Sequence, residues 1–416
     1  MRRRVVVTGL GTVNPVGLNV GETWQSLLNG KSGIARIQAF DPDQWGVDSK
    51  IAGEVKGFES EKWLDRKEAR RLDRFSQFAL VSAIEAMEHA NLRLEGDVRF
   101  DVGVILASGA GGLITILDQN TTLKEKGARR VSPFAVPMFM ANAAAGCISI
   151  HFGCWGPSFA IASACASSAD SLGVALDMIR TGRAEAIVAG GSEATVVPLS
   201  VASFDRAQAL STHFNDQPER ASRPFDRDRD GFVLSEGAAV LVLEDEAFAK
   251  TRGARVLAEF VGYGAYADGF HITAPEPEGR GATAAMRTAL RDSGSDGSDV
   301  VYVNAHGTST QLNDKVESLA VAKVFGERVK QVPISSTKSM TGHLAGAAGA
   351  LEALVCVKVV ETGWAPPTIN YDTPDPECNL DYIPWKARQI PPGLVLSNSF
   401  GFGGHSTCLA FRRYVP

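Results

Sequence analysis

Residues 156–182 read GPSFAIASACASSADSLGVALDMIRTG and contain a short strand, a turn and a helix in direct succession. The first part is extended and ends in small residues. After the turn, Leu172, Leu176 and Ile179 repeat at helical spacing on one apolar face, and Gly182 offers a C-cap. A strand that runs straight into an amphipathic helix is the repeating unit of α/β proteins, so this stretch predicts a layered α/β fold.

The same succession of strand, glycine and helix recurs along the chain. Short apolar runs at residues 5–8, 102–106, 186–188 and 300–304 precede glycine-containing turns, and another buried strand is expected at 239–244. The run at 5–11 (VVVTGLG) has a weak echo at 257–264 (LAEFVGYG). This echo suggests a duplicated architecture whose halves join near residues 245–255.

The composition excludes several classes of protein. The 416 residues are 44% hydrophobic and 21% charged, as in an ordinary globular protein, and the net charge of −5 argues against nucleic-acid binding. No apolar run approaches the length of about 18 residues that predicts a membrane span. The basic residues 2–4 lead directly into a strand and do not resemble a leader. The six cysteines lack C-x-x-C spacing, so we expect reduced thiols and a cytoplasmic location.

Cys165 lies at the turn between the strand and the helix of residues 156–182. The N–H groups and the dipole of a helix N-terminus favour a thiolate over a thiol. The small neighbours Ala164, Ala166 and Ser167 would leave the sulfur accessible. A nucleophile and a small buried hydrophobic residue both fit this stretch taken alone. The other five cysteines are interpreted as core or surface thiols.

Two of the seven histidines follow strand-like runs. His306 follows VYVNA, and His343 follows the run at 332–336 and is expected to open a small-residue helix through Glu352. Open α/β sheets place their sites at the carboxyl ends of strands. Either histidine alone could be structural, but two of them together with Cys165 favour one shared site. We interpret the others outside the C-terminal region as structural or surface residues: His89, His151, His213 and His271.

Metal sites are not favoured by the spacing of possible ligands. Cys165, His306 and His343 could form a zinc set, but no short-spaced pair anchors it. The run from Asp226 to Gly231 resembles the start of a calcium loop. Its twelfth position is Gly237 instead of glutamate, and two arginines dilute its charge. We therefore expect no bound metal.

Several longer motifs resemble the ketosynthases of fatty-acid and polyketide synthesis, closest to the elongating β-ketoacyl-acyl carrier protein synthase II group. The motifs run nearly from end to end: VVVTGLG at 5–11, SACAS at 163–167, RPFDRDRDGF at 223–232, NAHGTST at 304–310, KSMTGHLAGAAGALE at 338–352 and NSFGFGGH at 398–405. The resemblance implies a duplicated thiolase-like fold, layered αβαβα with two mixed sheets. Residues 1–250 would form the half that carries the nucleophile, and residues 251–416 the half that carries both histidines.

The resemblance also implies a catalytic set. Cys165, His306 and His343 match the family's Cys-His-His site, in which the cysteine takes an acyl group. The histidines donate hydrogen bonds to the thioester of a malonyl unit while it loses carbon dioxide. Lys338 matches a lysine that supports the second histidine, and Glu352 matches a buried acid of the same network.

Further residues match the walls of the family's cavity. Phe402 matches a gating phenylalanine whose N–H joins that of Cys165 in an oxyanion hole, and Ala110 falls in the acyl pocket. Three threonines match residues that bind the phosphopantetheine arm: Thr273, Thr308 and Thr310. No bound cofactor is expected, because the carrier protein supplies the phosphopantetheine.

An acidic carrier protein requires a basic surface. Lys67, Arg70 and Arg71 match the family's docking helix. Together with Arg66 and Arg74 they fall at i, i+3 and i+4 spacings, which predict one basic helix face across residues 66–74. A second basic group consists of Lys124, Lys126, Arg129 and Arg130. The alternative to a docking surface is a solvated helix face, where nearby acidic residues reduce the positive charge. The family implies a homodimer, and no nucleic-acid or membrane partner is expected.

Some positions depart from the usual elongation enzyme. Ala110 stands where the family usually has a bulky acyl-pocket residue, and Gln208 stands where it has a docking arginine. The usual Thr-Gly after the nucleophile is replaced by Ser167-Ser168, and Asn313-Asp314 follows the His306 motif. A polyene-type polyketide ketosynthase working with a chain-length factor is therefore an alternative to fatty-acid elongation. Three further classes are less favoured. A non-catalytic subunit would lack the nucleophile, a thiolase needs a second cysteine near residues 401–405, and a cysteine hydrolase needs one histidine with an orienting amide or acid.

Overall fold

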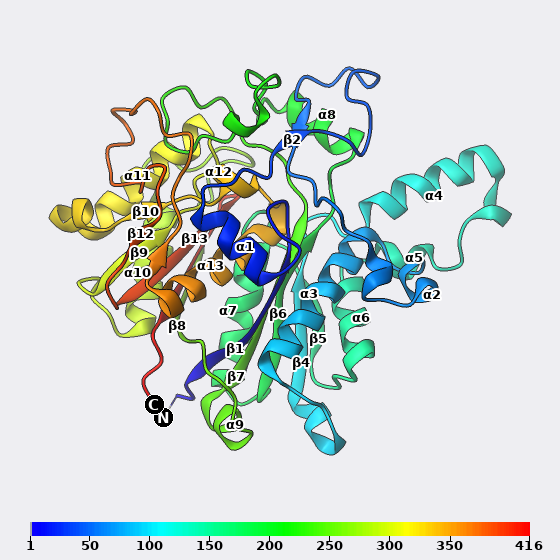
Figure 1. Cartoon of the computed structure of the whole chain (residues 1–416), viewed down its shortest axis with the longest axis horizontal. Coiled ribbons are helices and arrows are strands. Elements are labelled where there is room, and N and C mark those ends of the chain that lie inside the picture. Colours follow the sequence, from blue (N-terminus) through cyan, green and yellow to red (C-terminus); the bar gives the residue numbers. More distant parts are fainter. Residues whose placement is uncertain (1) are drawn as a thin grey trace.

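The computed structural model describes residues 2–416, and its centre is a ten-stranded mixed sheet (Figure 1). Five strands come from the first part of the chain: β1 (Val5–Val13), β4 (Val102–Ala107), β5 (Ser158–Ile161), β6 (Ala186–Glu193) and β7 (Gly237–Asp245). Five come from the second part: β8 (Ala258–Ala267), β9 (Val300–Asn304), β10 (Ile334–Ser335), β13 (Leu394–Gly401) and β14 (His405–Arg412).

The two sets of strands have the same order. The first set runs β5-β4-β6-β7-β1 and the second runs β10-β9-β13-β14-β8, which is third, second, fourth, fifth and first in both. The echo between residues 5–11 and 257–264 therefore reflects two equivalent first strands. The expected duplicated α/β fold is confirmed. The two mixed sheets are joined edge to edge, because Val5–Val7 of β1 pairs antiparallel with residues 258–260 of β8.

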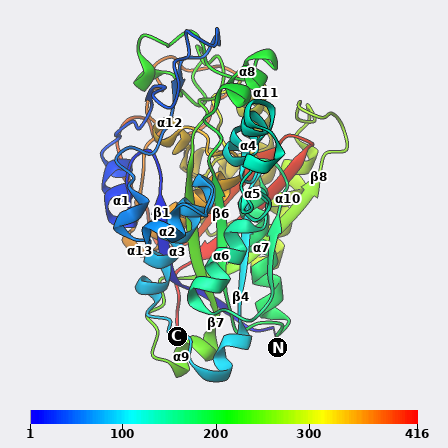
Figure 2. The same ribbon diagram turned by 90° about the vertical axis from the view of Figure 1, so that its right-hand side faces the viewer.

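Helices complete a five-layer arrangement (Figures 1 and 2). The central helices α7 (Ser167–Arg180) and α13 (Ala348–Thr362) contact strands of both sets and share one apolar core with them. The outer face of the first set is covered by α3 (Arg74–Ala90) and α6 (Ala143–Phe152). The outer face of the second set is covered by α10 (Arg280–Ser293) and α11 (Gln311–Phe325).

The remaining elements lie around this core. The helices are α1 (Val20–Leu28), α2 (Arg66–Ala69), α4 (Leu113–Lys126), α5 (Ala135–Phe139), α8 (Pro198–Arg206), α9 (Glu246–Thr251) and α12 (Lys338–Thr341). Two small ladders pair β2 (Ala35–Arg36) with β3 (Ile51–Ala52) and β11 (Trp364–Ala365) with β12 (Arg388–Gln389). Across residues 2–416, no helix has both the length and the apolar character needed to cross a membrane.

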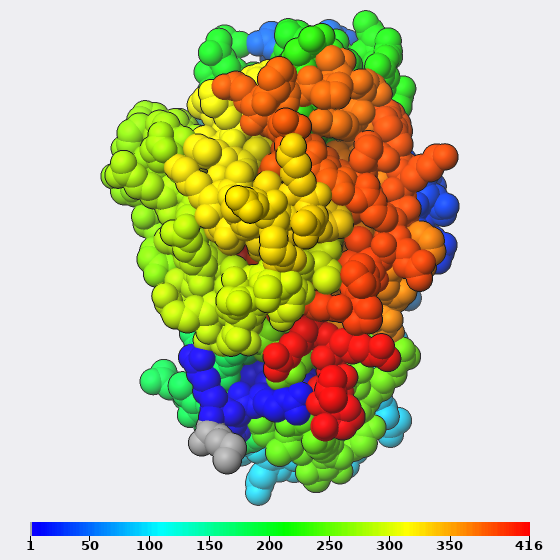
Figure 3. Space-filling view, turned by 90° about the vertical axis from the view of Figure 1, so that its left-hand side faces the viewer, coloured from blue at the N-terminus to red at the C-terminus, as the bar shows by residue number. Residues whose placement is uncertain are grey.

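The two ends of the chain lie side by side (Figure 3). Arg4 donates to both oxygens of Glu259 at 3.0 and 3.1 Å and to the carbonyl of Val415 at 2.9 Å. Its guanidinium also lies 5.1 Å from the centre of the Tyr414 ring. These contacts tie the first strand to the end of the last strand, close to where the two sheets meet.

Two local expectations are wrong. His343 does not open a helix: Gly342 has φ +67° and turns the chain, a 3-10 turn follows at Ala345–Ala347, and α13 begins at Ala348. Residues 66–74 are not one helix either. The first helix ends at Ala69, and the carboxylate of Asp73 caps a new helix by accepting the N–H of Phe75 at 3.2 Å. The spacing of the basic residues alone did not reveal that a second helix starts after Asp73.

Candidate active site

One cavity of about 670 Å³ brings the candidate catalytic side chains together. Cys165, His306 and His343 all line it. The other predicted cavity residues line it as well: Ala110, Thr273, Thr308, Thr310 and Phe402. Lys338 and Glu352 lie behind this wall and are buried.

Cys165 lies in a tight turn between β5 and α7. Ala164 has φ +51°, which is unfavourable for a residue with a side chain, and local hydrogen bonds hold it there. The Ser167 hydroxyl accepts the N–H of Ser163 at 2.8 Å and donates to the carbonyl of Ala164 at 2.6 Å. Gly401 fits behind the turn, because a Cβ there would lie 2.9 Å from the nitrogen of Cys165. Cys165 as a whole residue is half-buried.

The resting thiol is protonated at neutral pH. Burial raises the pKa of Cys165 to about 11, although the charge of Lys338 and the N–H of Phe402 act to lower it. The expected thiolate is therefore wrong for the free enzyme. The helix begins only at Ser167, and desolvation of the sulfur outweighs the favourable dipole. The hairpin that carries Phe402 lies against this turn, because Gly401 packs on the nitrogen of Cys165.

A buried carboxylate fixes the backbone of His306. Glu317, on α11, accepts the N–H groups of His306 at 2.8 Å and Gly307 at 2.7 Å, and the amide of Asn398 donates to it at 3.2 Å. Sequence reasoning missed this residue. The available signal was the pair Asp314 and Glu317, which lie three residues apart on the buried face of α11.

The two histidine rings are adjacent and lie nearly perpendicular to each other, edge to face. Their centroids are 5.2 Å apart and their planes differ by 85°. Lys338 Nζ lies 3.3 Å from Nδ1 of His306. An ammonium only donates, so Nδ1 accepts and Nε2 carries the ring proton of His306. The resemblance assigned this lysine to the second histidine, but its hydrogen bond is to His306, the first of the two.

Both imidazoles are neutral. Burial lowers the pKa of His306 and of His343 well below the usual value, and the charge of Lys338 lowers both further. Lys338 also donates to Glu352. Burial raises the pKa of Glu352 to about 7, and Lys338 opposes this effect. Neutral imidazoles can donate an N–H to a substrate oxygen without adding charge.

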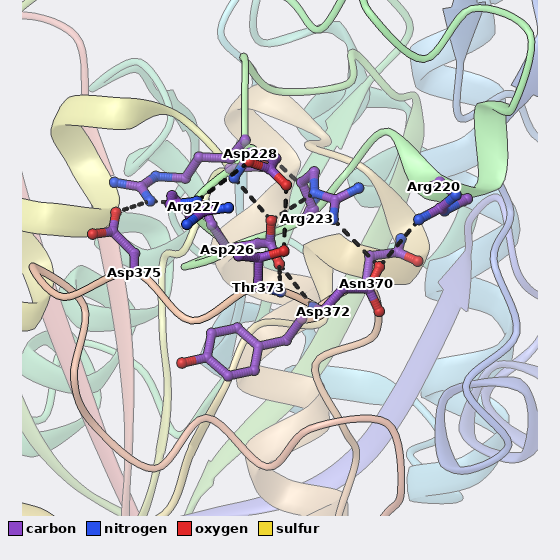
Figure 4. Close-up of polar contacts among 12 residues, drawn as sticks. Arg220, Arg223, Asp226, Arg227, Asp228, Asn370, Asp372, Thr373 and Asp375 are labelled. Atoms are coloured by element: carbon purple, nitrogen blue, oxygen red, sulfur yellow. Dashed lines mark hydrogen bonds and ion pairs between the residues drawn. The ribbon is translucent and has the colours of Figure 1, made fainter.

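The motif at 223–232 connects the two histidine loops, and Figure 4 shows polar contacts made by part of this motif. Arg229 is buried and donates to the carbonyls of Thr310 and Gln311 at 3.0 Å and to Asp375 at 2.5 Å. Just beyond it, Gly231 donates to the carbonyl of Ser309 at 3.1 Å. The segment then reaches the second loop, where His343 donates to the carbonyl of residue 233 at 2.8 Å. The acidic run forms ion pairs here: Arg223 donates to Asp226 at 3.0 Å.

A second missed carboxylate shapes the part of the cavity that contains Ala110. Glu193 lines the cavity and accepts the N–H groups of Gly109 at 2.8 Å, Ala110 at 3.1 Å and Gly346 at 3.0 Å. It thereby joins the loop that carries Ala110 to the loop that follows His343. At the other end, the hydroxyls of Thr308 and Thr310 lie 2.9 Å apart.

The basic residues lie outside the cavity. Lys67, Arg70 and Arg71 are exposed on α2 and the turn after it, and the Arg71 guanidinium lies 4.6 Å from the centre of the Phe134 ring. Arg74 does not belong to this surface, because it pairs with buried Glu236 at 2.6 Å. The second group is exposed at the end of α4 and in the following 3-10 turn: Lys124, Lys126, Arg129 and Arg130. Helix α4 projects from the body in Figure 1.

Most other cysteines and histidines have structural settings. The nitrogen Nδ1 of His89 accepts the N–H of Leu10 at 3.3 Å. His405, which the sequence did not single out, lines the cavity. All six cysteines are free thiols, and within residues 2–416 no cluster of three or more His, Cys, Asp or Glu has the geometry to hold a metal ion.

Comparison with known proteins agrees with this geometry. The family model "Beta-ketoacyl synthase, N-terminal domain" matches residues 2–249, and "Beta-ketoacyl synthase, C-terminal domain" matches residues 257–372. The chain is 46% identical over 413 residues to 3-oxoacyl-acyl-carrier-protein synthase 2 of Synechocystis sp., covering 99% of each. It is 45% identical over 412 residues to the protein of that name from Staphylococcus aureus, again covering 99% of each.

Solved structures give the same result. A chain of a complex between a type II polyketide synthase acyl-carrier protein and its ketosynthase, AntDE:AntF, superposes with TM-score 0.92 at 36% identity, covering 100% of each chain. A chain of the ishigamide ketosynthase/chain length factor superposes with TM-score 0.91 at 33% identity, covering 100% of each.

The chain therefore belongs to the β-ketoacyl synthase family. It is an acyltransferase of the ketosynthase class, and the curated relatives compared with it here carry the name 3-oxoacyl-acyl-carrier-protein synthase 2.

Proposed function

We propose that this enzyme joins an acyl group on Cys165 to a malonyl unit on an acyl carrier protein by decarboxylative Claisen condensation. The observation that carries the proposal is one cavity lined by a thiol and two neutral imidazoles, with the Nε2–H tautomer of His306 fixed by Lys338. A thiol supplies a nucleophile, and neutral N–H donors stabilise a developing enolate oxygen.

The reaction has two half-reactions. In the first, the sulfur of Cys165 attacks the thioester of an acyl carrier, the carrier thiol leaves with the proton, and an acyl-Cys165 thioester remains. In the second, His306 and His343 donate hydrogen bonds to the malonyl thioester oxygen while carbon dioxide leaves. The resulting enolate carbon attacks the acyl-Cys165 carbonyl, the bond to sulfur breaks, and the 3-oxoacyl chain stays on the carrier. The N–H groups of Cys165 and Phe402 would hold the oxyanion, with each donor contributing about 3–4 kcal/mol.

The partners follow from this reaction. A loaded carrier protein would deliver its phosphopantetheine arm past Thr273, Thr308 and Thr310, so no resident cofactor is required. Lys67, Arg70 and Arg71, with Arg129 and Arg130, would contact its acidic surface. The enzyme would pair with a second copy of itself or with a chain-length factor, as the ishigamide and ApeO ketosynthases do with theirs. Six free thiols suit the reducing cytoplasm.

The proposal is tested with acyl- and malonyl-carrier protein, followed by mass spectrometry of the enzyme and of the product. We expect acylation at Cys165 and a 3-oxoacyl product two carbons longer than the starting chain. Cys165→Ala should abolish the acyl-enzyme, whereas Cys165→Gln should still release carbon dioxide because both histidines remain. Acylation of another residue in Cys165→Ala would overturn the assignment of the nucleophile.

A second candidate is condensation of longer or stiffer chains in a specialised polyketide pathway. Ala110 lines the acyl end of the cavity, where a larger side chain would shorten it, and the fold matches the ishigamide ketosynthase/chain length factor. Replacing Ala110 with isoleucine should shorten the products. Products of unchanged length would remove this argument and leave ordinary fatty-acid elongation.

A further inference from the structure

A carboxylate outside the cavity contacts both segments that meet at Cys165. Asp170 lies in the first turn of α7 and is not one of the residues that line the cavity. Its Oδ1 accepts the hydroxyl of Thr407 at 2.6 Å and the hydroxyl of Tyr263 at 3.0 Å. Its Oδ2 accepts the hydroxyl of Ser163. Three hydroxyl donors from both sets of strands therefore converge on one carboxylate.

The first donor belongs to the nucleophile turn. Ser163 is buried, and its carbonyl accepts the N–H of Ala166 at 3.1 Å. Cys165 lies between these two residues and directly follows Ala164, which has φ +51°. A turn with a residue in this region persists only where its surroundings hold it. Rotation of Ser163 would therefore move the N–H and the sulfur of Cys165.

The second donor belongs to the hairpin that carries Phe402. Thr407 lies on β14 and pairs with Ser399 on β13, so it is close to the turn between these strands. Gly401, at the start of that turn, packs against the nitrogen of Cys165. The hairpin and the nucleophile turn thus abut each other, and Asp170 holds a hydroxyl from each.

The third donor, Tyr263, lies on β8 and holds the carboxylate of Asp170 from that side. The ring of Tyr263 packs on Gly173, one turn after Asp170, where a Cβ would lie only 2.3 Å from the ring. Burial and the charge of Asp170 raise the pKa of Tyr263, so its hydroxyl keeps the proton that it donates. A side chain at position 173 would displace this donor.

We propose that Asp170 is a positioning residue that sets the spacing between the N–H groups of Cys165 and Phe402. This inference rests on the proposed function, in which these groups form the oxyanion hole. His306 and His343 belong to other loops. Loss of Asp170 therefore slows the steps that pass through a tetrahedral intermediate on Cys165 and leaves malonyl decarboxylation intact.

The test measures three rates on one set of variants: acylation of Cys165, condensation, and carbon dioxide release from malonyl-carrier protein. In Asp170→Ala, acylation and condensation should fall about 100-fold, comparable to loss of one oxyanion donor. Carbon dioxide release should stay within about twofold of wild type, which also shows that the variant is folded. Asp170→Asn keeps an acceptor oxygen and should restore part of the lost rate. Asp177→Ala, an exposed acid on the same helix, is the matched control.

Thr407→Val changes only the hydroxyl that Asp170 accepts and is the milder variant. It should slow acylation on its own and add nothing in the Asp170→Ala background, because coupled residues are not additive. Wild-type acylation in Asp170→Ala, or a parallel loss of all three rates, would overturn the inference. Failure of the wild-type enzyme to form acyl-Cys165 would instead overturn the proposed function, so the two failures are distinguishable.

Discussion

Nζ of Lys338 lies 3.3 Å from Nδ1 of His306 and also donates to the buried carboxylate of Glu352. The same ammonium lowers the pKa of His306, of His343 and of Cys165. One buried cation therefore acts on all three candidate catalytic groups. It selects the tautomer of one imidazole and helps to keep both imidazoles neutral. It also lowers the pKa of the thiol, which burial raises.

Replacing this cation should affect decarboxylation. In Lys338→Met, nothing holds the Nε2–H tautomer of His306, and we expect carbon dioxide release from malonyl-carrier protein to fall about 100-fold, a typical loss for a positioned proton donor. Lys358→Met breaks a lysine–glutamate pair on α13, the helix that carries Glu352, and serves as the control. Equal rates in the two variants would contradict the role given to Lys338.

The high pKa of Cys165 predicts a steep pH dependence of its alkylation. Because only the thiolate reacts, the rate of labelling by iodoacetamide should rise about tenfold per pH unit between pH 7 and 9, with no plateau below the pKa of about 11. In Lys338→Met the rate at each pH should be lower, since the ammonium lowers that pKa. A plateau near pH 7 would show that the thiol is already ionised. Labelling is followed on the Cys165 peptide by mass spectrometry.

The neutral histidines should make the protein sensitive to acid. Their pKa values are lower in the folded than in the unfolded chain. Their contribution to stability is therefore present above about pH 6.5 and is lost as pH falls, by at most about 1.4 kcal/mol per pH unit for each histidine. Urea unfolding of His343→Gln should lose less stability than wild type between pH 6.5 and 5.5.

The control variant is His213→Gln, which removes a histidine whose side chain is exposed. Glu317 and Glu352 act in the opposite direction. Burial raises the pKa of each to about 7, so their contribution is lost as pH rises through that value. Because both proteins contain these glutamates, the difference in pH dependence between His343→Gln and wild type gives the contribution of His343 alone. An identical pH dependence in His343→Gln would contradict the neutral assignment.

Two neighbouring arginines should differ sharply in their effect on stability. Arg229→Ala leaves the buried carboxylates of Asp314 and Asp375 without their partner, and we expect the free energy of unfolding to fall by about 3–5 kcal/mol. Arg227 is exposed and lies 3.6 Å from exposed Asp228, so Arg227→Ala should cost less than about 1 kcal/mol. Urea unfolding measures both, and similar values would contradict the structural role of the buried network in Figure 4.

The proposed carrier surface predicts a salt-dependent binding defect. The double variant Lys67→Glu/Arg71→Glu should raise KM for the acyl carrier protein about tenfold at low salt and less at high salt, with kcat unchanged. A small pantetheine thioester lacks the acidic protein and should be unaffected. The control is Lys330→Glu, an exposed lysine in the 3-10 turn after α11. A lower kcat with unchanged KM would place these residues outside the docking surface.

The fold was predictable because its signals are local. Short apolar runs that end in glycine located the main strands, and the apolar spacing of Leu172, Leu176 and Ile179 located the central helix α7. The joining of the sheets at β1 and β8 was not predictable, since only three residue pairs specify it. The break between α2 and α3 was missed because a cap at Asp73 restarts the helix within an unbroken charge pattern.

The reacting groups of the site were predictable from the sequence, but the carboxylates that hold them in position were not. Cys165, His306 and His343 stand out because each follows a strand and small residues surround them. Glu193, Glu317 and Asp170 act through backbone and hydroxyl contacts across 7 to more than 200 positions of sequence. No spacing rule reveals such pairings. The raised pKa of Cys165 was missed for the same reason, because burial depends on the whole fold.

The shared strand order places two pairs of site residues at matching positions in the two halves. Cys165 and Lys338 follow the third strands, β5 and β10, whereas Ala110 and His306 follow the second strands, β4 and β9. Under the proposed mechanism, one copy of the ancestral unit accommodates the growing chain and the other activates the extender. This division of labour lets chain-length preference evolve through one copy while the decarboxylation apparatus of the other is left unaltered.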